Sequence, residues 1–340
     1  QDEMKLALLL AMINPHLGGV LLIGPRGTGK TTAVRSLPEL LPKTLRSLCY
    51  YGCMPEDIEA GGMDAVCPDC AKKYAEGKPL ARLDRVRLIE LPLNARLEDV
   101  VGGLDERAAL RGQVRLRKGI LAQADRNLLY VDEVNLLADD VVDAILDAAA
   151  QGYYHVRRGA VTATFRSRFV LIGSMNPEEG RLRPQILDRF GLRVIVRGLK
   201  DRAQRLEAYR RARAYMTNPR QVARQFAPST ALAQEDIQAA RELLPQVEIP
   251  DDVANLGLEL IERLEIDSLR AEITLFEAAR AHAIADARME VGPQDIHAVA
   301  PLALRLRRSA FMQNYFQQQD VEEKELQNIL DEVIHPGEQA

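Results

Sequence analysis

The chain has 340 residues, a length typical of about two domains. Hydrophobic residues make up 47% and charged residues 28%, a balance that permits a large buried core and argues against general disorder. The net charge of −4 gives no overall attraction to nucleic acid or to an anionic membrane, and because neither a signal peptide nor a spanning apolar run is visible, we expect a cytoplasmic protein without a membrane span.

The first part of the chain alternates between expected helices and short apolar strands. Short, fully apolar strands separated by helices predict a mostly parallel sheet that is covered on both faces. We therefore expect an α/β domain over residues 1–199. Its main elements are expected to be a helix over 2–13, a strand over 19–23, a helix over 31–41, and strands over 128–131, 169–172 and 194–196.

A glycine-rich segment follows the first of these strands and opens a helix. Residues 24–31 fit the phosphate-binding pattern G-x-x-x-x-G-K-[ST], in the strand-to-helix context that the pattern requires. Backbone N–H groups and the positive end of the helix attract a polyphosphate there, with Lys30 reaching the phosphates and Thr31 binding Mg²⁺. The residues expected to bind ATP or ADP are Gly24, Pro25, Arg26, Gly27, Thr28, Gly29, Lys30, Thr31 and Thr32.

The expected strand over 128–131 ends in two adjacent carboxylates. We expect Asp132 to hold Mg²⁺ and Glu133 to polarise the attacking water as a general base. Two acids at a strand end can also cap the next helix, but their place in a parallel-sheet pattern favours the metal and water roles. The Asp–Glu pair favours ATP hydrolysis over a GTPase switch.

All four cysteines of the chain fall within one short segment, after the helix expected over 31–41 and before residue 92. Their pattern is Cys49-x₃-Cys53-x₁₃-Cys67-x₂-Cys70, and soft thiolates at such spacing suit tetrahedral Zn²⁺. We expect a structural zinc module over residues 49–70. Reduced free thiols, paired disulfides and an iron–sulfur cluster remain alternatives.

From about residue 200 onward every expected element is a helix. The pattern predicts helices over 201–215, 234–244, 253–264, 268–287 and 293–310, so residues 200–340 are expected to form a helical lid and C-terminal domain. Residues 200–224 are rich in arginine. We interpret them as a solvated face or a subunit contact, because their tyrosines are not interleaved as base stacking on nucleic acid would require.

With both phosphate motifs placed, the chain resembles the AAA+ ATPases, a P-loop α/β core followed by an all-α lid. Residues 169–177 are similar to the first sensor strand of that family, which implies that Asn176 orients the attacking water. Residues 187–190 resemble its arginine motif, which implies that Arg189 reaches the γ-phosphate on a neighbouring subunit. Arg270 matches the second sensor position. The resemblance thus implies a catalytic set of Lys30, Glu133, Asn176, Arg189 and Arg270.

The similarity is closest to one branch, the ATPase (I) subunits of magnesium chelatase. It is carried by residues 19–30, 129–137, 174–191 and 268–275 and by the Arg-Leu-Arg-Arg run that ends at Arg308, and the four-cysteine module is an addition to it. The resemblance implies a helix-two insertion at about 92–120 and a β-hairpin at about 152–165.

The same resemblance implies a hexameric ring that hydrolyses ATP with Mg²⁺. Its implied partners are a second ATPase-like subunit with a von Willebrand A domain and a large porphyrin-binding subunit, and its implied task is to drive Mg²⁺ insertion into protoporphyrin IX for chlorophyll synthesis. One alternative is a MoxR-type remodelling ATPase that acts with a von Willebrand A partner on a protein client. A nucleic-acid-binding module is the alternative from another class.

Overall fold

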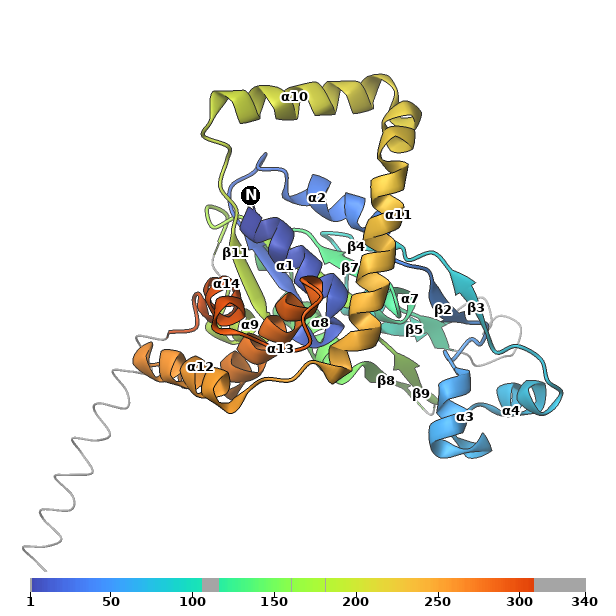
Figure 1. The fold of residues 1–340 in the computed structure, drawn as a ribbon. Helices are drawn as coiled ribbons and strands as arrows, with labels where there is room; N and C mark the ends of the chain where they lie inside the picture. The colour runs from blue at the N-terminus through green and yellow to red at the C-terminus, as the bar shows by residue number, and fades with distance from the viewer. Residues whose placement is uncertain (1, 106–115, 160, 181, 309–340) are drawn as a thin grey trace, which may run out of the picture.

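A five-stranded parallel sheet organises the computed structural model, which describes residues 2–105, 116–159, 161–180 and 182–308 (Figure 1). The strand order is β11-β1-β10-β7-β4, and each pairing between these strands is parallel. The carboxyl ends of β1, β7 and β10 therefore lie side by side, and the predicted phosphate and metal motifs follow directly from these ends. The strands are β1 (Val20–Ile23), β4 (Leu88–Leu91), β7 (Leu128–Val131), β10 (Val170–Met175) and β11 (Leu192–Ile195).

Each face of the sheet has its own core because alternate residues of a strand point to opposite sides. Val20 and Leu22 join a cluster formed with helices α1, α13 and α14, whereas Leu21 and Ile23 join a cluster formed with α5, α7 and α8. Both faces are thus covered, as the continuous apolar strands predict. The helices are α1 (Asp2–Ile13), α5 (Leu97–Val101), α7 (Ile120–Ala124), α8 (Asp139–Gln151), α13 (Leu269–Ala285) and α14 (Pro293–Leu304).

The predicted helices and strands of the α/β part all form, although β10 runs on to Met175 and β11 begins at Leu192. Two larger differences concern a helix end and an additional strand. The helix expected over 31–41 is α2 (Lys30–Ser36) followed by a 3₁₀ turn, Leu37–Leu40, because Pro38 has no N–H with which to continue an α-helix. Strand β4 was not predicted. Glu90 interrupts its apolar run, and the structure explains this residue by its ion pair with Arg35 of α2.

The C-terminal part is helical as predicted, but two helix limits differ. Helix α11 (Pro219–Leu243) begins well before residue 234, because the Asn218 side chain caps its first turn and Pro219 suits the first helical position. Helix α14 ends at Leu304 rather than continuing to residue 310, and residues 309–310 lie outside the described residues. The remaining helices are α10 (Arg202–Thr217), α12 (Asp251–Arg263) and α9 (Pro184–Arg189).

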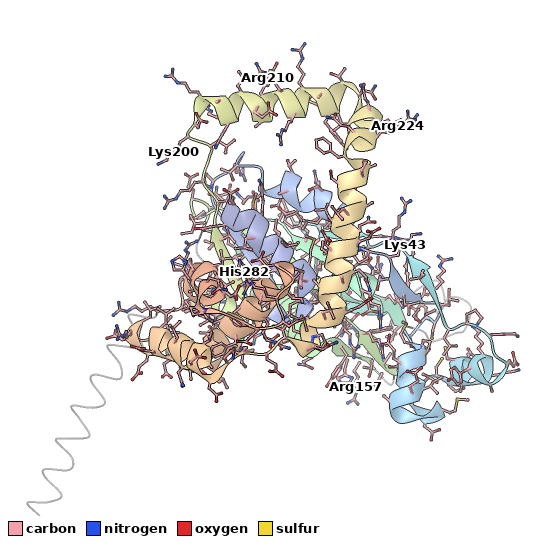
Figure 2. All side chains as sticks on the ribbon, in the orientation of Figure 1. Lys43, Arg157, Lys200, Arg210, Arg224 and His282 are labelled. Carbon is pink, nitrogen blue, oxygen red and sulfur yellow. The ribbon has the colours of Figure 1, made fainter. Side chains whose placement is uncertain are left out.

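Helix α10 lies apart from the sheet, and α11 runs from it back toward the body (Figure 1). Every residue of α10 is exposed to solvent, and Arg210 and Arg224 point outward in Figure 2. The arginine-rich stretch is therefore a solvated surface in the single chain. None of the helices in the described part of the chain combines the length and the apolar character that a membrane span requires.

Three small antiparallel units are added to the sheet. Strands β8 (Tyr153–Arg158) and β9 (Val161–Arg166) confirm the predicted hairpin, of which residue 160 lies outside the described residues. Strands β5 (Gly102–Leu104) and β6 (Leu116–Lys118) pair within the predicted insertion at 92–120, whose residues 106–115 are likewise not described. Strands β2 (Thr44–Ser47) and β3 (Ala81–Asp84) pair at the base of the cysteine segment, which contains α3 (Pro55–Gly61) and α4 (Pro68–Ala75).

Candidate active site

The glycine-rich loop joins β1 to α2 at the carboxyl edge of the sheet. Gly27 and Gly29 have φ values of 76° and 88°, a left-handed conformation that favours glycine. A side chain on Gly24 would place its Cβ 2.2 Å from the carbonyl oxygen of Val196, so this position also requires glycine. The sequence pattern of the loop is thus matched by a backbone that other residues would distort.

Lys30 lies inside this loop. Its Nζ donates hydrogen bonds to the carbonyl oxygens of Gly24 (2.6 Å) and Pro25 (2.8 Å). Burial lowers the pKa of Lys30, and the nearby carboxylates of Asp132 and Glu133 act in the opposite direction. These acids belong to the second motif, so the two motifs face each other across the strand ends.

A chain of hydroxyl contacts joins the two predicted Mg²⁺ ligands. Thr31 Oγ1 lies 3.1 Å from the hydroxyl of Tyr130, which donates to Asp132 Oδ1 at 2.8 Å. Ser174 of β10 donates to the same carboxylate oxygen. The hydroxyl of Thr31 and the carboxylate of Asp132 therefore lie close together, and hard oxygen donors of this kind suit Mg²⁺.

Sequence reasoning did not assign a role to Tyr130 or Ser174. The available signal was a hydroxyl in each of two otherwise apolar strands, two residues before Asp132 in one case and two residues before Asn176 in the other. Burial raises the pKa of Tyr130 to about 12, so its hydroxyl stays protonated and can donate to Asp132.

Glu133 is positioned by a backbone hydrogen bond and by an ion pair with an arginine of the phosphate loop. Its φ of 49° is left-handed, which is uncommon for a residue with a side chain and is frequent at functional sites. Its N–H donates to Ser174 Oγ at 3.2 Å, and its carboxylate accepts a hydrogen bond from Arg26 at 3.0 Å. Arg26 also pairs with Glu179. The candidate base thus faces the phosphate loop.

Asn176 ends β10 next to the Glu133 segment. Its side chain is buried, and its Oδ1 accepts a hydrogen bond from the N–H of Glu178 at 3.3 Å. Its carbonyl oxygen accepts one from the side-chain amide of Asn135, two residues after Glu133. The structure therefore brings Asn176 to the same edge as the loop and the two acids.

The two other predicted residues, Arg189 and Arg270, are grouped with each other and not with the loop. Arg189 pairs with Asp147 of α8 at 2.6 Å. Arg270 pairs at 3.3 Å with Asp188, the residue before Arg189. Arg307, whose side chain is fully buried, bonds the same Asp188 carboxylate at 2.7 Å. Asp188 thus links the lid helix α13 to the arginine motif of α9.

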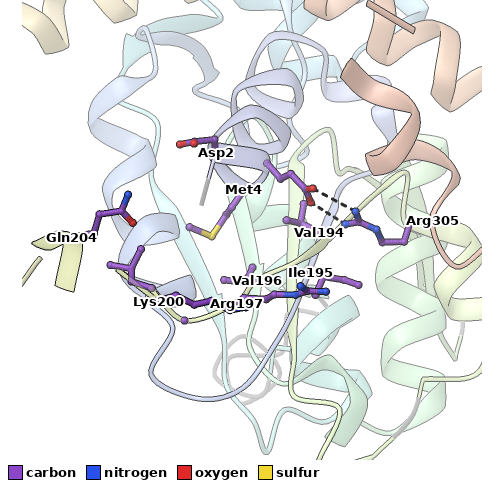
Figure 3. Close-up of a pocket in the computed structure, with 12 residues that line it drawn as sticks. Asp2, Met4, Val194, Ile195, Val196, Arg197, Lys200, Gln204 and Arg305 are labelled. Atoms are coloured by element: carbon purple, nitrogen blue, oxygen red, sulfur yellow. Dashed lines mark hydrogen bonds and ion pairs between the residues drawn. The ribbon is translucent and has the colours of Figure 1, made fainter. Parts of the chain in front are cut away.

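A cavity of about 540 Å³ opens beside the loop, between the amino end of α1 and the carboxyl end of β11 (Figure 3). Val196 lines it and also contacts Gly24, so the cavity adjoins the phosphate loop. Met4 supplies an apolar wall, and Glu3 and Arg305 form a 3.0 Å ion pair across it.

The four cysteines meet as the sequence predicts. One ligand atom from each lies within 4.8 Å of all the others, and Cys49 Sγ is 3.6 Å from the sulfurs of both Cys53 and Cys67. These separations exceed a disulfide bond of about 2.05 Å and approach the ~3.8 Å between sulfurs that surround a tetrahedral zinc. A hydrogen bond from Cys53 lowers the pKa of Cys49 to about 4, which favours the thiolate that a metal binds.

The Ser174→Ala substitution tests the hydroxyl chain. It removes the hydrogen bonds that Ser174 makes with Asp132 and with the Glu133 backbone. We expect the Mg²⁺ concentration needed for half-maximal ATP turnover to rise about 10- to 100-fold, as for other residues that orient metal ligands. A magnesium titration of the ATPase rate measures this.

Ser167→Ala is the matched control, because Ser167 is also buried but donates to the carbonyl oxygen of Ala148, away from the acids. An unchanged magnesium requirement in Ser174→Ala, or an equal change in both variants, would contradict a role for Ser174 in orienting Asp132.

Comparison with known proteins connects this arrangement to a family. Residues 102–205 match the family model of the MCM P-loop domain, and residues 259–329 match that of the AAA lid domain. The magnesium-chelatase 38 kDa subunit of Acidiphilium rubrum is 44% identical over 310 residues, which cover 90% of the chain and 88% of that protein. A magnesium-chelatase subunit ChlI homolog of Methanocaldococcus jannaschii is 42% identical, over 92% of the chain and 84% of the homolog.

Solved structures agree. A structure from a complex between subunits BchI and BchD of magnesium chelatase is 40% identical, with a TM-score of 0.50, over 91% of the chain and 94% of that structure. A putative ATPase from Cytophaga hutchinsonii shares the fold at 20% identity, with a TM-score of 0.57, over 90% of the chain and 84% of its own.

Proposed function

Because the chain belongs to the family of magnesium-chelatase ATPase subunits, we propose that it is the ATP-driven motor of a magnesium-chelatase-type complex. The chain is an AAA+ ATPase with a P-loop core and a helical lid. The observation that carries the proposal is the hydroxyl chain from Thr31 through Tyr130 to Asp132, with Lys30 close enough to Asp132 and Glu133 to interact electrostatically.

We assign the chemical roles from these contacts. Thr31 and Asp132 would hold Mg²⁺, which would offset the negative charge of the phosphates. Lys30 exchanges its two carbonyl partners for the β- and γ-phosphates. Glu133 takes the proton of the attacking water, and Asn176 orients that water. The cavity at the amino end of α1 adjoins the loop and has an apolar wall, so it is the proposed site for the base and ribose of ATP.

We further propose that the site is completed by a neighbouring copy in a hexameric ring. Arg270 pairs with Asp188, the residue before Arg189, whereas Arg189 itself pairs with Asp147, and neither arginine shares a partner with Lys30 or Glu133. Both arginines would then approach the γ-phosphate on the next protomer. Their positive charges stabilise the transition state there, in exchange for the present pairing of Arg189 with Asp147.

The proposed partners follow from the family. They are a second ATPase-like subunit with a von Willebrand A domain and a large porphyrin-binding subunit, which carries out Mg²⁺ insertion into protoporphyrin IX for chlorophyll synthesis. The BchI–BchD complex supports an assembly with a second subunit. The porphyrin chemistry would take place on the large subunit, and all three would act in the cytoplasm.

The test combines the chain with both candidate partners from the same source. We expect ATP-dependent Mg²⁺ insertion, which is monitored by the fluorescence of the product. This insertion should disappear when either partner is omitted. ATP turnover without insertion in any combination would contradict the chelatase assignment and favour a MoxR-type remodelling ATPase.

We also propose that Cys49, Cys53, Cys67 and Cys70 bind one structural Zn²⁺. Four thiolates within 4.8 Å of one another fit a tetrahedral zinc site that has no open position. Elemental analysis of the purified chain is expected to give about one zinc per protomer, lost in Cys67→Ser together with Cys70→Ser. Bound iron together with visible absorbance would instead indicate an iron–sulfur cluster. A purified chain without any metal would contradict a metal site at the four cysteines.

A further inference from the structure

We propose that the four-cysteine module is a metal-locked clamp that holds the β8–β9 hairpin and strand β6 against the core of the α/β domain. This inference rests on the zinc site proposed above and adds a task to it. The clamp consists of residues 47–80, and its contact points are two tyrosines between the first two cysteines and two acids at the start of α3.

The tyrosines are placed by the first pair of ligands. Tyr50 and Tyr51 lie between Cys49 and Cys53, in a tight turn closed by a hydrogen bond from Gly52 N–H to the carbonyl oxygen of Cys49. The N–H of Tyr51 also donates to Cys49 Sγ at 3.3 Å. A metal bound by both sulfurs would therefore fix the backbone that carries both rings.

Both rings contact Phe165 near the end of hairpin strand β9. The Tyr51 ring stacks on Phe165 with a centroid separation of 6.4 Å and an interplanar angle of 22°, and the Tyr50 ring meets it edge-on at 6.4 Å. Phe165 is 1% exposed, so this is a buried anchor of the hairpin. Such aromatic pairs stabilise a contact beyond the burial of their apolar surface.

Tyr50 also reaches the insertion. Its hydroxyl donates to the carbonyl oxygen of Leu116 in β6, and the Lys118 ammonium lies 5.0 Å from its ring centroid. Tyr50 therefore contacts both the hairpin and strand β6. Strand β5, the partner of β6, also contacts hairpin strand β8, so the insertion and the hairpin contact each other directly as well.

Helix α3, between the two cysteine pairs, supplies ion pairs to the same region. Asp57 pairs with Arg166, the last residue of β9, and both side chains are largely buried. Glu56 accepts hydrogen bonds from Arg126, two residues before β7. The clamp thus contacts the hairpin, the insertion and the segment that enters strand β7, which is followed by Asp132 and Glu133.

The module has little interior of its own to hold this arrangement. Its buried cluster consists of Cys53, Cys70 and Leu80, with Ile58, Val66 and the other two cysteines partly buried around them. A segment of this size cannot gain enough from apolar burial to fix its loops, and small units of this kind rely on metals or disulfides. The four cysteines make up four of the seven residues of this cluster, so a metal bound there would supply the missing rigidity.

The experiment measures amide hydrogen exchange in peptides that cover residues 153–166 of the full chain. The variants are Tyr51→Ala, the double variant Cys67→Ser/Cys70→Ser, and Tyr74→Ala as the matched control. Tyr74 lies on α4 of the same module and is 41% exposed, against 46% for Tyr51. Zinc content is determined for each preparation.

We expect Tyr51→Ala to keep its zinc and to accelerate hairpin exchange about threefold to tenfold, the effect of losing one aromatic contact. The double variant loses zinc and accelerates exchange at least as much, whereas Tyr74→Ala changes neither. Unchanged hairpin exchange in a zinc-bound Tyr51→Ala protein and in the zinc-free double variant would overturn the clamp and leave the zinc site intact. A wild-type protein without metal would overturn the zinc site and the lock together.

Discussion

Replacing Glu133 with Gln is expected to abolish ATP turnover while leaving ATP binding intact. Glutamine keeps the shape and one hydrogen-bond acceptor but cannot take a proton from water. A general base contributes about 10²- to 10⁴-fold to the rate, so turnover should fall by that factor. Steady-state phosphate release measures the rate, and equilibrium binding of a fluorescent ATP analogue measures affinity.

Glu179→Gln is the control for this change. Glu179 and Glu133 both pair with Arg26 and are similarly buried, with side chains 23% and 19% exposed. A variant that only disturbed Arg26 would affect both positions alike. Turnover of Glu133→Gln within a few-fold of the wild type would exclude Glu133 as the base.

Replacing Arg189 with Ala is expected to remove hydrolysis from the assembled ring by a comparable or larger factor. An arginine supplied to a γ-phosphate by a neighbouring protein contributes about 10³- to 10⁵-fold in related phosphoryl transfers. ATP binding should persist, because Lys30 and the loop belong to the other protomer. Turnover is measured at concentrations where light scattering shows the ring.

Arg183→Ala is the matched control for Arg189→Ala. Arg183 pairs with Asp139 and Asp143 on the same helix α8 that holds Asp147, so it shares the acidic environment of Arg189. Equal losses in both variants would indicate that pairing with α8, rather than charge at the γ-phosphate, sustains activity.

The sequence predicts the phosphate loop and the acids well because each motif is local. Strand, turn and helix of the loop are contiguous, and the glycines report a backbone that the structure requires at Gly24, Gly27 and Gly29. The parallel sheet then brings Asp132 to the loop, since β7 and β1 are both neighbours of β10. Apolar strands with polar ends are sufficient for that inference.

The contacts between distant segments could not be predicted in this way. Ser174 reaches Asp132 across neighbouring strands, and Arg270 reaches Asp188 over 82 positions in the chain. A residue pattern within one element does not report either contact. The contact between Tyr51 and Phe165 could not be predicted either. Cysteine spacing predicts a four-sulfur cluster, but which residue Tyr51 contacts depends on how the hairpin packs.

The start of α11 and the whole of strand β4 escaped prediction for related reasons. The amino-terminal half of α11 is mostly exposed, so it lacks the apolar periodicity that marks a packed helix. The sequence signals for its start are the capping residue Asn218 and Pro219 at the first helical position. Strand β4 was missed because its apolar run contains a charged residue, Glu90. The edge strand accommodates Glu90 through an ion pair with Arg35 of α2, a contact that the local sequence does not reveal.

The central claim is that each ATP site is shared by two protomers, and mixed rings test it most directly. Arg189→Ala and Glu133→Gln subunits, each inactive alone, are combined at equal concentrations and allowed to exchange. Some interfaces in the mixture then join an intact Glu133 site to an intact Arg189. We predict that ATP turnover recovers to a clear fraction of the wild-type rate. A mixed ring, shown by mass spectrometry to contain both variants, that remains as inactive as its parents would contradict the shared site.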